Sequence, residues 1–357
     1  MIDLAIGGII RLTVEIDRLP KGVNVLFIWE VREELKEYLR NALRDLEEVQ
    51  LIFPQHAKEE EYLAYAEEAN IIVGWRPTME VLNKSSSLEL FINPGAGVQH
   101  LLGIFKDLNT RRKVVLVNGH GNSYFTAQHA VALLLCLANK VILHHNWMVD
   151  GQWRKGDDDG KSIPLRKRKI GLLGYGAVNT KVHRFLSGFD VEFHILKKSW
   201  QNQHEEMNVA AKYEPHQLYE FLANIDILVN ATPHTSETEG MIGKRELEIL
   251  GPEGLLVNIG RGSTIDEESL YNALLNGTIK GAALDVWYNY QPISNEDGKK
   301  WPYSYPFHEL TNVVLSPHRG ASPMDDLERW NEVIDNIRAY FSGSREFNNQ
   351  VDLERGY

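Results

Sequence analysis

Two glycines separated by one residue join a short apolar run to a helical segment, in the stretch KIGLLGYGAVN at residues 169–179. Gly174 permits a tight turn after a strand, and Gly176 lets the backbone approach a pyrophosphate. The helix that follows would direct its free N–H groups and the positive end of its dipole at the phosphates. Asn179 stands where this motif has its third glycine, so the helix must pack on the strand in another way. The predicted dinucleotide contacts are Gly174, Tyr175, Gly176, Ala177, Val178 and Asn179.

The residues at the end of the next predicted strand, Val191–Leu196, indicate which dinucleotide would bind. An acidic side chain at this point accepts hydrogen bonds from the adenosine ribose of NAD, whereas basic residues suit the 2′-phosphate of NADP. The strand ends without an acid and is followed by Lys197, Lys198 and Ser199. We therefore predict NADP as the preferred cofactor and keep NAD as the alternative. The alternative is that these residues form a solvent-exposed basic turn that binds no phosphate.

Short apolar runs rich in β-forming residues alternate with helical segments along the chain, and this rhythm predicts parallel sheets covered by helices. One series occupies the first third of the chain, and a second begins at Lys169. Between them, Thr126–Val149 is predicted to form one long helix that leads from the first domain to the second. A final amphipathic helix is predicted at Asp326–Phe341. The predicted strands are Asn24–Trp29, Val49–Phe53, Ile71–Trp75, Leu88–Asn93, Ile170–Leu173, Val191–Leu196, Ile225–Asn230, Gly254–Ile259, Ala282–Val286 and Val313–Leu315.

The composition is that of a globular protein, since 43% of the 357 residues are hydrophobic and 24% are charged. The formal net charge of −11 argues against sequence-independent binding to nucleic acid or to an anionic membrane. No run approaches the ~18 apolar residues of a membrane span, and the first residues do not resemble a signal peptide. Cys136 is the one cysteine, so no internal disulfide can form. We expect a cytoplasmic protein, mature from Met1, with no metal site.

Five further motifs resemble those of the D-isomer-specific 2-hydroxyacid dehydrogenases, a family that includes glycerate, phosphoglycerate and D-lactate dehydrogenases. The resemblance extends from Phe91 to Trp330 and is densest over residues 170–320. It is carried by NPGAGVQH at 93–100, VNATPHT at 229–235, VNIGRGS at 257–263, GAALDVW at 281–287 and SPH at 316–318.

The resemblance implies a role for each motif. Arg261 would bind the carboxylate and keto oxygen of the substrate, and His318 would exchange the proton of the substrate hydroxyl. The alternatives are that Arg261 is a surface residue and that His318 has only a structural role. Arg76, at the end of a first-domain strand, is a candidate for a second substrate contact. The implied contacts are the backbone amides of Gly95, Ala96, Gly97 and Val98, which form an anion nest for the substrate carboxylate, and Thr232, Pro233, Ile259, Gly260 and Asp285 for the cofactor.

One residue of the family pattern is missing. Five positions past Asp285 the family has a glutamate that pairs with the catalytic histidine and raises its pKa, but this chain has Tyr290, followed by Gln291. Without the carboxylate, we expect His318 to be neutral more often at neutral pH, which suits alcohol oxidation and slows keto-acid reduction at high pH. Formate dehydrogenases of the same superfamily have a glutamine in this role, so Gln291 is the other candidate counterpart.

With the resemblance, the sequence predicts an α/β protein of two Rossmann-like domains, one flavodoxin-like and one dinucleotide-binding, with a cleft between them. Residues 1–118 and 320–357 would form the substrate-binding domain, and residues 119–319 the NAD(P)-binding domain. The expected activity is hydride transfer between nicotinamide and a small 2-hydroxy or 2-keto acid, in a homodimer formed through the long helix. The alternatives are a formate-type dehydrogenase and a nucleotide-sensing binding protein, which the missing glutamate permits but the retention of Arg261 and His318 disfavours.

Overall fold

The computed structural model describes residues 22–154, 158–200, 209–321 and 326–357, and these form two compact units. The first unit contains the described residues up to Ala96, together with Gly103–Gly119 and Trp330–Val351. The second contains Gly97–Leu102, Asp352–Tyr357 and the described residues between His120 and Arg329. These units differ from the predicted domains in that the described residues among 97–102, 320–329 and 352–357 group with the second unit and Gly119 with the first, and the domain boundaries stay a prediction. Residues 1–21 of the predicted first domain lie outside the described residues.

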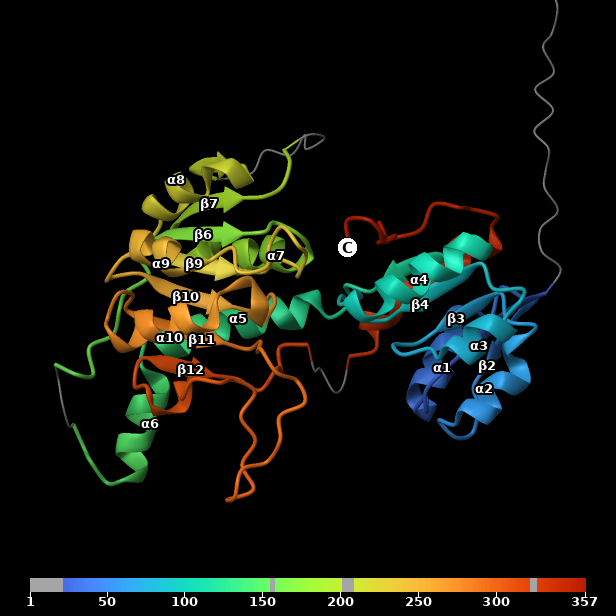
Figure 1. Ribbon diagram of the computed structural model, residues 1–357, viewed down its shortest axis with the longest axis horizontal. Helices are drawn as coiled ribbons and strands as arrows, with labels where there is room; N and C mark the ends of the chain where they lie inside the picture. Colours follow the sequence, from blue (N-terminus) through green and yellow to red (C-terminus); the bar gives the residue numbers. More distant parts are fainter. Residues whose placement is uncertain (1–21, 155–157, 201–208, 322–325) are drawn as a thin grey trace, which may run out of the picture. The chain divides into compact units, whose positions relative to one another are not determined.

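The first unit is built on a five-stranded parallel sheet with the order β2-β1-β3-β4-β5 (Figure 1). This is the flavodoxin-like strand order, as predicted. Its strands are β1 (Val23–Phe27), β2 (Val49–Ile52), β3 (Ile71–Val73), β4 (Leu90–Asn93) and β5 (Val115–Asn118). Its helices are α1 (Glu33–Ala42), α2 (Glu59–Ala66), α3 (Met79–Lys84), α11 (Asn331–Phe341) and α4 (Gln99–Arg111), whose first residues group with the second unit.

The second unit is built on a seven-stranded parallel sheet with the order β12-β11-β10-β9-β6-β7-β8. Counted from β6, this is the order of the dinucleotide-binding fold, and it reverses direction between β6 and β9. The strands are β6 (Lys169–Leu173), β7 (Glu192–Leu196), β8 (Ala211–Tyr213), β9 (Ile227–Asn230), β10 (Leu255–Asn258), β11 (Gly281–Leu284) and β12 (Val313–Leu315).

The helices of the second unit cover both faces of this sheet (Figure 1). The α-helices are α5 (Ser123–Ala138), α6 (Val141–Val149), α7 (Ala177–Leu186), α8 (Leu218–Ala223), α9 (Lys244–Leu250) and α10 (Glu267–Leu275). The short 3₁₀ turns are η1 (Ser187–Phe189), η2 (Pro215–Gln217), η3 (Gly262–Thr264), η4 (Phe307–Glu309) and η5 (Glu328–Trp330), whose last residue begins the C-terminal part of the first unit.

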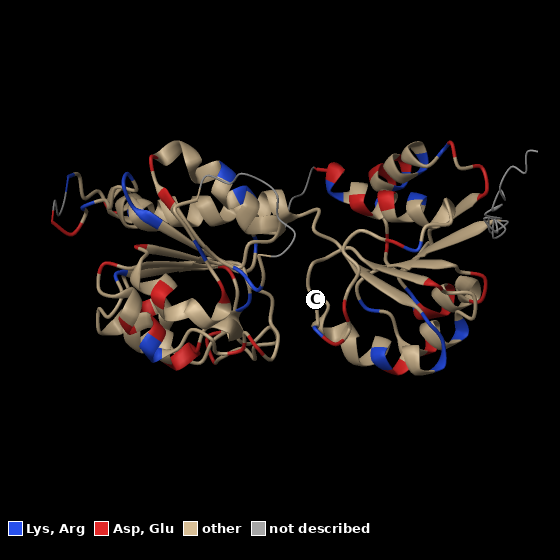
Figure 2. Ribbon diagram, turned by 90° about the horizontal axis from the view of Figure 1, so that it is seen from above, with Lys and Arg blue, Asp and Glu red and all other residues tan. Residues whose placement is uncertain are grey.

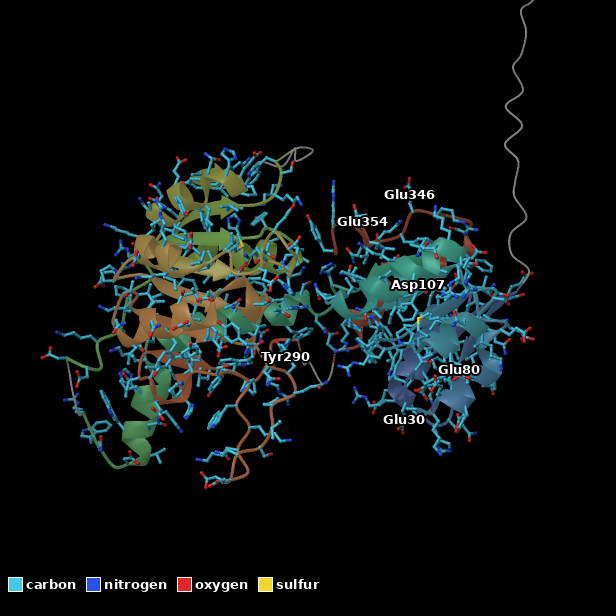
Figure 3. All side chains as sticks on the ribbon, viewed as in Figure 1. Glu30, Glu80, Asp107, Tyr290, Glu346 and Glu354 are labelled. Carbon is cyan, nitrogen blue, oxygen red and sulfur yellow. The ribbon has the colours of Figure 1, made fainter. Side chains whose placement is uncertain are left out.

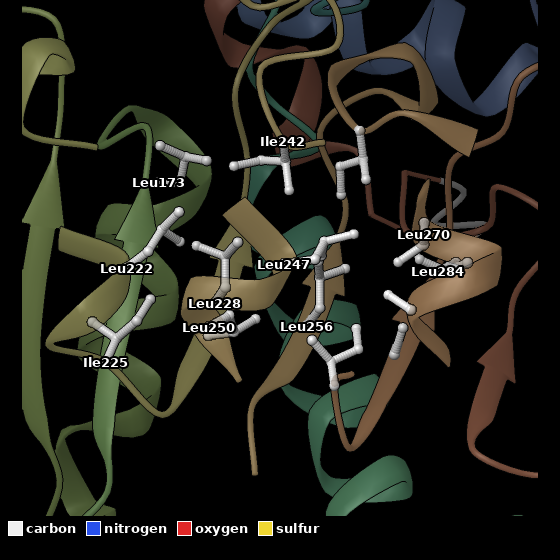
Figure 4. Close-up of a cluster of buried hydrophobic side chains, with 14 of the residues drawn as sticks. Leu173, Leu222, Ile225, Leu228, Ile242, Leu247, Leu250, Leu256, Leu270 and Leu284 are labelled. Atoms are coloured by element: carbon white, nitrogen blue, oxygen red, sulfur yellow. The ribbon is translucent and has the colours of Figure 1, made fainter. Parts of the chain in front are cut away.

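The central strands are buried on both faces, which explains why the sequence shows continuous apolar runs instead of alternation. One face packs on α8, α9 and α10 through Leu222, Leu247 and Leu270. The other face packs on α5 and α7 through Leu134 and Val182. Figure 4 shows the first cluster, to which successive strands contribute Leu173, Leu228, Leu256 and Leu284. Charged residues are concentrated in the outer helices and loops of each unit and are scarce in the strands (Figure 2).

The predicted long helix Thr126–Val149 is wrong, because the structure breaks it into α5 and α6 with a bend of 62°. Asn139 ends α5, and Lys140 adopts a left-handed conformation with φ of 52°. A run of apolar residues predicts a helix, but it does not reveal that a single residue within the run adopts a left-handed conformation and ends the helix. Among the described residues no single helix is long and apolar enough to cross a membrane, and α5 with α6 reaches that length and composition only as a bent pair.

Candidate functional site

The motif residues of the second unit gather at the carboxyl edge of its parallel sheet, where the strands β6, β7, β9, β10, β11 and β12 end. Open parallel sheets bind ligands at this edge, next to the point where the strand order reverses. The chain therefore brings together residues that are up to 144 positions apart in the motifs, from Gly174 to His318, by strand topology alone.

The turn after β6 leaves room for a dinucleotide phosphate. Gly174 has φ of +77°, a conformation that residues with a Cβ atom rarely adopt. A Cβ atom at Gly176 would meet no atom within 4 Å, so the space in front of α7 is open. The first turn of α7 has no side-chain cap, which leaves its N–H groups available to an anion. These residues fit the dinucleotide that the sequence predicts.

Asn179 replaces the third glycine of the motif by hydrogen bonding. Its side chain is fully buried, and its Nδ2 donates to the carbonyl oxygens of Leu173, Gly174 and Val229 at 3.2, 2.7 and 3.2 Å. The amide thus fastens the start of α7 to the ends of β6 and β9. Close packing of helix on sheet, which a glycine achieves by its small size, is achieved here by a polar side chain that satisfies strand carbonyls.

The two lysines after β7 have different partners. Lys198 forms an ion pair with Glu237 at 2.7 Å, and this hydrogen bond raises the pKa of its ammonium group. The Lys197 ammonium lies over the ring of Trp200, 4.3 Å from its centroid, and burial lowers its pKa. Ser199 is the third residue of the predicted set. A shared 2′-phosphate site at Lys197, Lys198 and Ser199 stays a prediction.

Two glycines fix the backbone that carries Arg261. A Cβ atom at Gly260 would lie 2.6 Å from the carbonyl oxygen of Thr232, and one at Gly262 would lie 2.3 Å from that of Trp287. Both distances are below van der Waals contact, so only glycine fits on either side of the arginine. The Arg261 carbonyl accepts hydrogen bonds from Asn258 Nδ2 and Thr264 Oγ1, at 3.2 and 2.7 Å.

The Arg261 guanidinium is packed against the predicted carboxylate-binding turn. A Cβ atom at Gly97 would lie 2.5 Å from Arg261 Nη2, so the absence of a side chain at Gly97 makes room for the guanidinium. Burial lowers the pKa of Arg261, while Tyr290 acts in the opposite direction. Val98, beside Gly97, is buried. An anion that binds the amides of this turn would therefore meet a positive charge.

The other predicted substrate residues belong to the first unit. The Gly95 carbonyl accepts from the Asn93 side chain and from the N–H of Gly119, and the Ala96 carbonyl accepts from Asn118 Nδ2 at 2.8 Å. These bonds fix the turn after β4 and leave its amides uninvolved in them. Arg76 is exposed after β3, and its predicted role as a substrate contact stays a prediction.

A buried asparagine network, which the sequence analysis missed, joins the ends of β9 and β10. Asn230 Nδ2 donates to Asn258 Oδ1 at 3.0 Å and to Thr264 Oγ1 at 2.7 Å. Asn230 Oδ1 accepts from the N–H and the Oγ1 of Thr232 at 3.1 and 2.7 Å. The N–H of Gly260 donates to Asn258 Oδ1 at 3.2 Å, and the N–H of Ile259 donates to the Asn230 carbonyl at 3.1 Å. The two asparagines thus position Thr232, Ile259 and Gly260, three of the predicted cofactor residues, and Pro233 follows Thr232 in the chain. Both strands end in Val-Asn, and this repeated pair at two strand ends is the sequence signal that could have revealed it.

His318 contacts Tyr290 through its Nδ1. Tyr290 lies in the segment that follows β11 and is labelled in Figure 3. His318 has φ of 55°, and its Nδ1 lies 2.7 Å from Tyr290 Oη, with the two rings in edge-to-face contact. Burial lowers the pKa of the His318 imidazole, Asp285 raises it and Arg261 lowers it, and the result is a pKa below the ordinary value. Gln291 is exposed, and its N–H donates to Asn289 Oδ1 at 2.9 Å. Tyr290, and not Gln291, therefore contacts the histidine.

Asp285 braces the turn that carries His318. Its carboxylate is 2% exposed and accepts hydrogen bonds from Ser316 Oγ, from the N–H of Arg319 at 2.7 Å and from the N–H of Gly320 at 3.0 Å. His129, on α5, lies 2.9 Å from Ser316 Oγ and 3.3 Å from Asp285 Oδ1. Burial alone would raise the pKa of Asp285, but these donors lower it below its usual range. The sequence analysis missed His129, whose only signal is a polar residue among buried alanines of an apolar helix.

The chain is similar to known proteins of one family. A family model described as D-isomer specific 2-hydroxyacid dehydrogenase, NAD binding domain, matches residues 131–320. The chain is 31% identical to a glyoxylate reductase of Pyrococcus furiosus over 265 residues, which cover 72% of this chain and 74% of that protein. It is 26% identical to a glyoxylate/hydroxypyruvate reductase of Arabidopsis thaliana over 81% of this chain and 83% of the relative.

Among solved structures, the chain resembles an NADPH-dependent glyoxylate/hydroxypyruvate reductase of Sinorhizobium meliloti, crystallised in complex with NADP and malonate. The TM-score is 0.69 and the identity 26%, over 93% of this chain and 98% of that one. The similarity covers both units, so the two-unit architecture is shared along with the dinucleotide-binding unit.

The buried carboxylate predicts a pH-dependent stability. A carboxyl group whose pKa is lower in the folded than in the unfolded state stabilises the fold above its unfolded pKa, and this contribution is lost as the pH falls through the folded pKa. We expect Asp285→Asn to reduce the free energy of unfolding by about 2–4 kcal/mol at neutral pH, because an amide cannot accept from all of these donors. The difference in the free energy of unfolding between Asp285→Asn and wild type should become smaller below a pH of about 4, where the carboxyl group of the unfolded chain is protonated.

Urea unfolding of the full chain at a series of pH values measures this difference. Asp352→Asn is the matched control, since Asp352 is an exposed carboxylate that also accepts from backbone N–H groups, of Glu354 and Arg355. It should change stability little. An Asp285→Asn variant as stable as wild type, or one whose deficit is the same at acid pH, would contradict the bracing role.

Proposed function

Because the chain belongs to the D-isomer-specific 2-hydroxyacid dehydrogenases, a family of NAD(P)-dependent oxidoreductases, we propose that it reduces small 2-keto acids to 2-hydroxy acids. The observation that carries the proposal is the placement of Arg261 against Gly97 in the same unit as His318, at the sheet edge where the dinucleotide turn lies. An anion-binding arginine and a titratable imidazole beside a hydride-carrier site are the groups that keto-acid reduction needs.

Each residue has a separate task in this reaction. A bound nicotinamide supplies the hydride. Arg261 binds the substrate carboxylate and polarises the keto oxygen, and the amides of Gly97 and Val98 add donors for the carboxylate. His318 gives a proton from Nε2 to the keto oxygen, and in the reverse direction Nε2 takes it back. Asp285 keeps the turn of His318 in place.

The alternatives receive less support. A formate-type site would use Gln291 beside the histidine, but Gln291 is exposed while Tyr290 contacts His318. A nucleotide-sensing protein has no need for a guanidinium whose burial lowers its pKa or for a braced left-handed histidine. Both outcomes remain distinguishable by assay.

The decisive assay is a panel of glyoxylate, hydroxypyruvate, pyruvate, branched 2-keto acids and formate, with NADPH and NADH for reduction and NADP and NAD for formate oxidation. We expect reduction of the keto acids.

His318→Gln should lower kcat by a factor of about 10²–10⁴ and leave the affinity for the cofactor unchanged, because proton donation is lost. Arg261→Lys should mainly raise KM, since a lysine cannot form the bidentate contact. His216→Gln, at an exposed histidine, is the control and should match wild type. Cofactor binding without turnover on any acid would favour the sensor, and formate oxidation the formate-type enzyme.

We propose NADPH as the preferred cofactor. The proposal is supported by the absence of an acid after β7, by the adjacent Lys197 and Lys198, and by the Sinorhizobium meliloti relative that was crystallised with NADP. When the 2′-phosphate binds, Lys198 would exchange Glu237 for the phosphate, which carries more negative charge.

Titration of protein fluorescence with NADPH and with NADH tests this preference. NADPH should bind at least tenfold more tightly. Lys198→Ala should weaken NADPH binding by about tenfold and leave NADH binding within about twofold, because one charged hydrogen bond is lost only with the phosphorylated cofactor. Lys280→Ala, at a lysine paired with Glu253, is the control. Tighter binding of NADH would refute the preference.

We also propose a homodimer in which a second copy of the chain covers α6. No residue of α6 is buried, although the helix is mostly apolar, and Ile142, Met148 and Val149 are 50%, 56% and 71% exposed. Trp153, just beyond the helix, is 73% exposed. Exposed apolar patches of this kind mark association surfaces.

Light scattering coupled to gel filtration measures the mass in solution. The wild-type chain should elute as a dimer, and Ile142→Glu combined with Val149→Glu should yield monomers, because two charges would be buried unpaired at the interface. Leu275→Glu, at a leucine of α10 that is 56% exposed, should remain dimeric. A monomeric wild type, or a double variant that remains dimeric, would exclude α6 as the interface.

A further inference from the structure

Tyr290 takes the place of a carboxylate but differs from it in hydrogen bonding. Its Oη lies 2.7 Å from His318 Nδ1 and also accepts a hydrogen bond from the N–H of Trp287 at 3.3 Å. A carboxylate in this position only accepts, so it requires a hydrogen on Nδ1. A phenol both accepts and donates, and the Trp287 N–H already occupies part of its acceptor capacity. The Tyr290 hydroxyl can therefore donate its hydrogen to Nδ1 while it accepts from the Trp287 N–H.

Burial and the neighbouring charges favour the protonated phenol of Tyr290 and the neutral imidazole of His318, since the pKa of the first is raised and that of the second is lowered. Burial is the main reason that the pKa of Tyr290 is raised, Trp287 and Arg261 lower it, and Asp285 raises it. The groups that face His318 are Tyr290, Arg261 and Asp285, and its pKa is lowered overall. Asp285 does not compete for the ring nitrogen, because its oxygens accept from Ser316 and from the backbone N–H groups that follow His318.

We propose that Tyr290 is a positioning residue that donates its phenolic hydrogen to Nδ1 of His318 and so holds the neutral ring in the tautomer with its hydrogen on Nε2. The inference rests on the proposed keto-acid reduction and deepens it. A neutral ring in this tautomer presents an N–H donor to the keto oxygen, whereas oxidation needs a bare Nε2 as base. The pair thus favours reduction, which reverses the sequence-based expectation that a neutral His318 suits oxidation.

The proton that the substrate receives comes from His318 and is replaced through Tyr290 and water. As the substrate gains hydride on carbon, the Nε2–H bond breaks and an O–H bond forms on the former keto oxygen. Nδ1 takes the hydrogen of Tyr290, so the ring stays neutral. After the product leaves, Nε2 takes a proton from water and Nδ1 returns its hydrogen to the phenolate of Tyr290, so the ring again carries its hydrogen on Nε2.

The test is the ¹⁵N NMR spectrum of the full chain labelled at histidine, since ring nitrogens with and without hydrogen have distinct shifts. Signals of His318 are assigned by their loss in His318→Gln. At mildly alkaline pH the wild-type ring should carry its hydrogen on Nε2. Tyr290→Glu should move it to Nδ1 and raise the pKa of His318 by about one unit or more, because the partner is then an anion. Tyr290→Phe keeps the ring contact but should give a mixture of tautomers.

Tyr303→Phe is the matched control. Tyr303 Oη lies 3.2 Å from His308 Nδ1, a second tyrosine–histidine pair in the segment between β11 and β12, and its loss should shift signals of His308 and not those of His318. In kinetics, Tyr290→Glu should raise the ratio of kcat for oxidation to kcat for reduction by about tenfold, as expected for one charged hydrogen bond. If Tyr290→Glu does not fold, the tautomer of His318 in the Tyr290→Phe variant alone tests the inference.

A wild-type ring with its hydrogen on Nδ1, or a Tyr290→Phe spectrum equal to wild type, would overturn the inference. The NMR result does not depend on turnover, so its failure is separate from failure of the keto-acid panel. If the panel shows no reduction while the tautomer is as expected, the proposed function fails and the hydrogen bond stands.

Discussion

The site depends on one buried carboxylate that remains ionised. Asp285 gathers a hydroxyl, two backbone N–H groups and a histidine around its oxygens, and these donors outweigh the cost of burial. The backbone N–H groups come from Arg319 and Gly320, directly after His318. They tie down a turn in which His318 has a left-handed conformation, which a residue with a Cβ atom adopts only where its surroundings hold it there. Loss of this anchor would release the imidazole from the sheet edge.

The rest of the site is placed by a packing constraint at the same edge. The ends of parallel strands lie close together, so the backbone of one loop contacts the backbone of the next. Gly260 and Gly262 permit these contacts, and the residue between them, Arg261, has its backbone held from both sides. Asn179 and Asn230 tie the neighbouring loops through buried amide hydrogen bonds. The polar groups of the proposed reaction are therefore positioned by hydrogen bonds and packing within the fold, as efficient catalysis requires.

The strands of both sheets could be predicted because buried parallel strands are continuous apolar runs, and the strand ends then located the functional residues. β8 was not predicted because Ala211–Tyr213 contains a lysine and is not an apolar run, and β5 was not predicted although Val115–Asn118 is mostly apolar. The break at Lys140 depends on a single backbone torsion angle. Counting placed Tyr290 where the family has its glutamate, but the sequence could not choose between Tyr290 and Gln291. Nor could it pair Lys198 with Glu237, because such partners are set by tertiary structure.

The central claim is that Arg261 and His318 act on one 2-keto acid, and a crystal structure of the full chain with NADPH and oxamate, a non-reducible keto-acid analogue, tests it most directly. The account predicts the oxamate carboxylate on the Arg261 guanidinium and the amides of Gly97 and Val98, with its amide carbonyl oxygen within hydrogen-bond distance of His318 Nε2. Oxamate bound elsewhere, or bound to Arg261 with His318 turned away from it, would contradict the account.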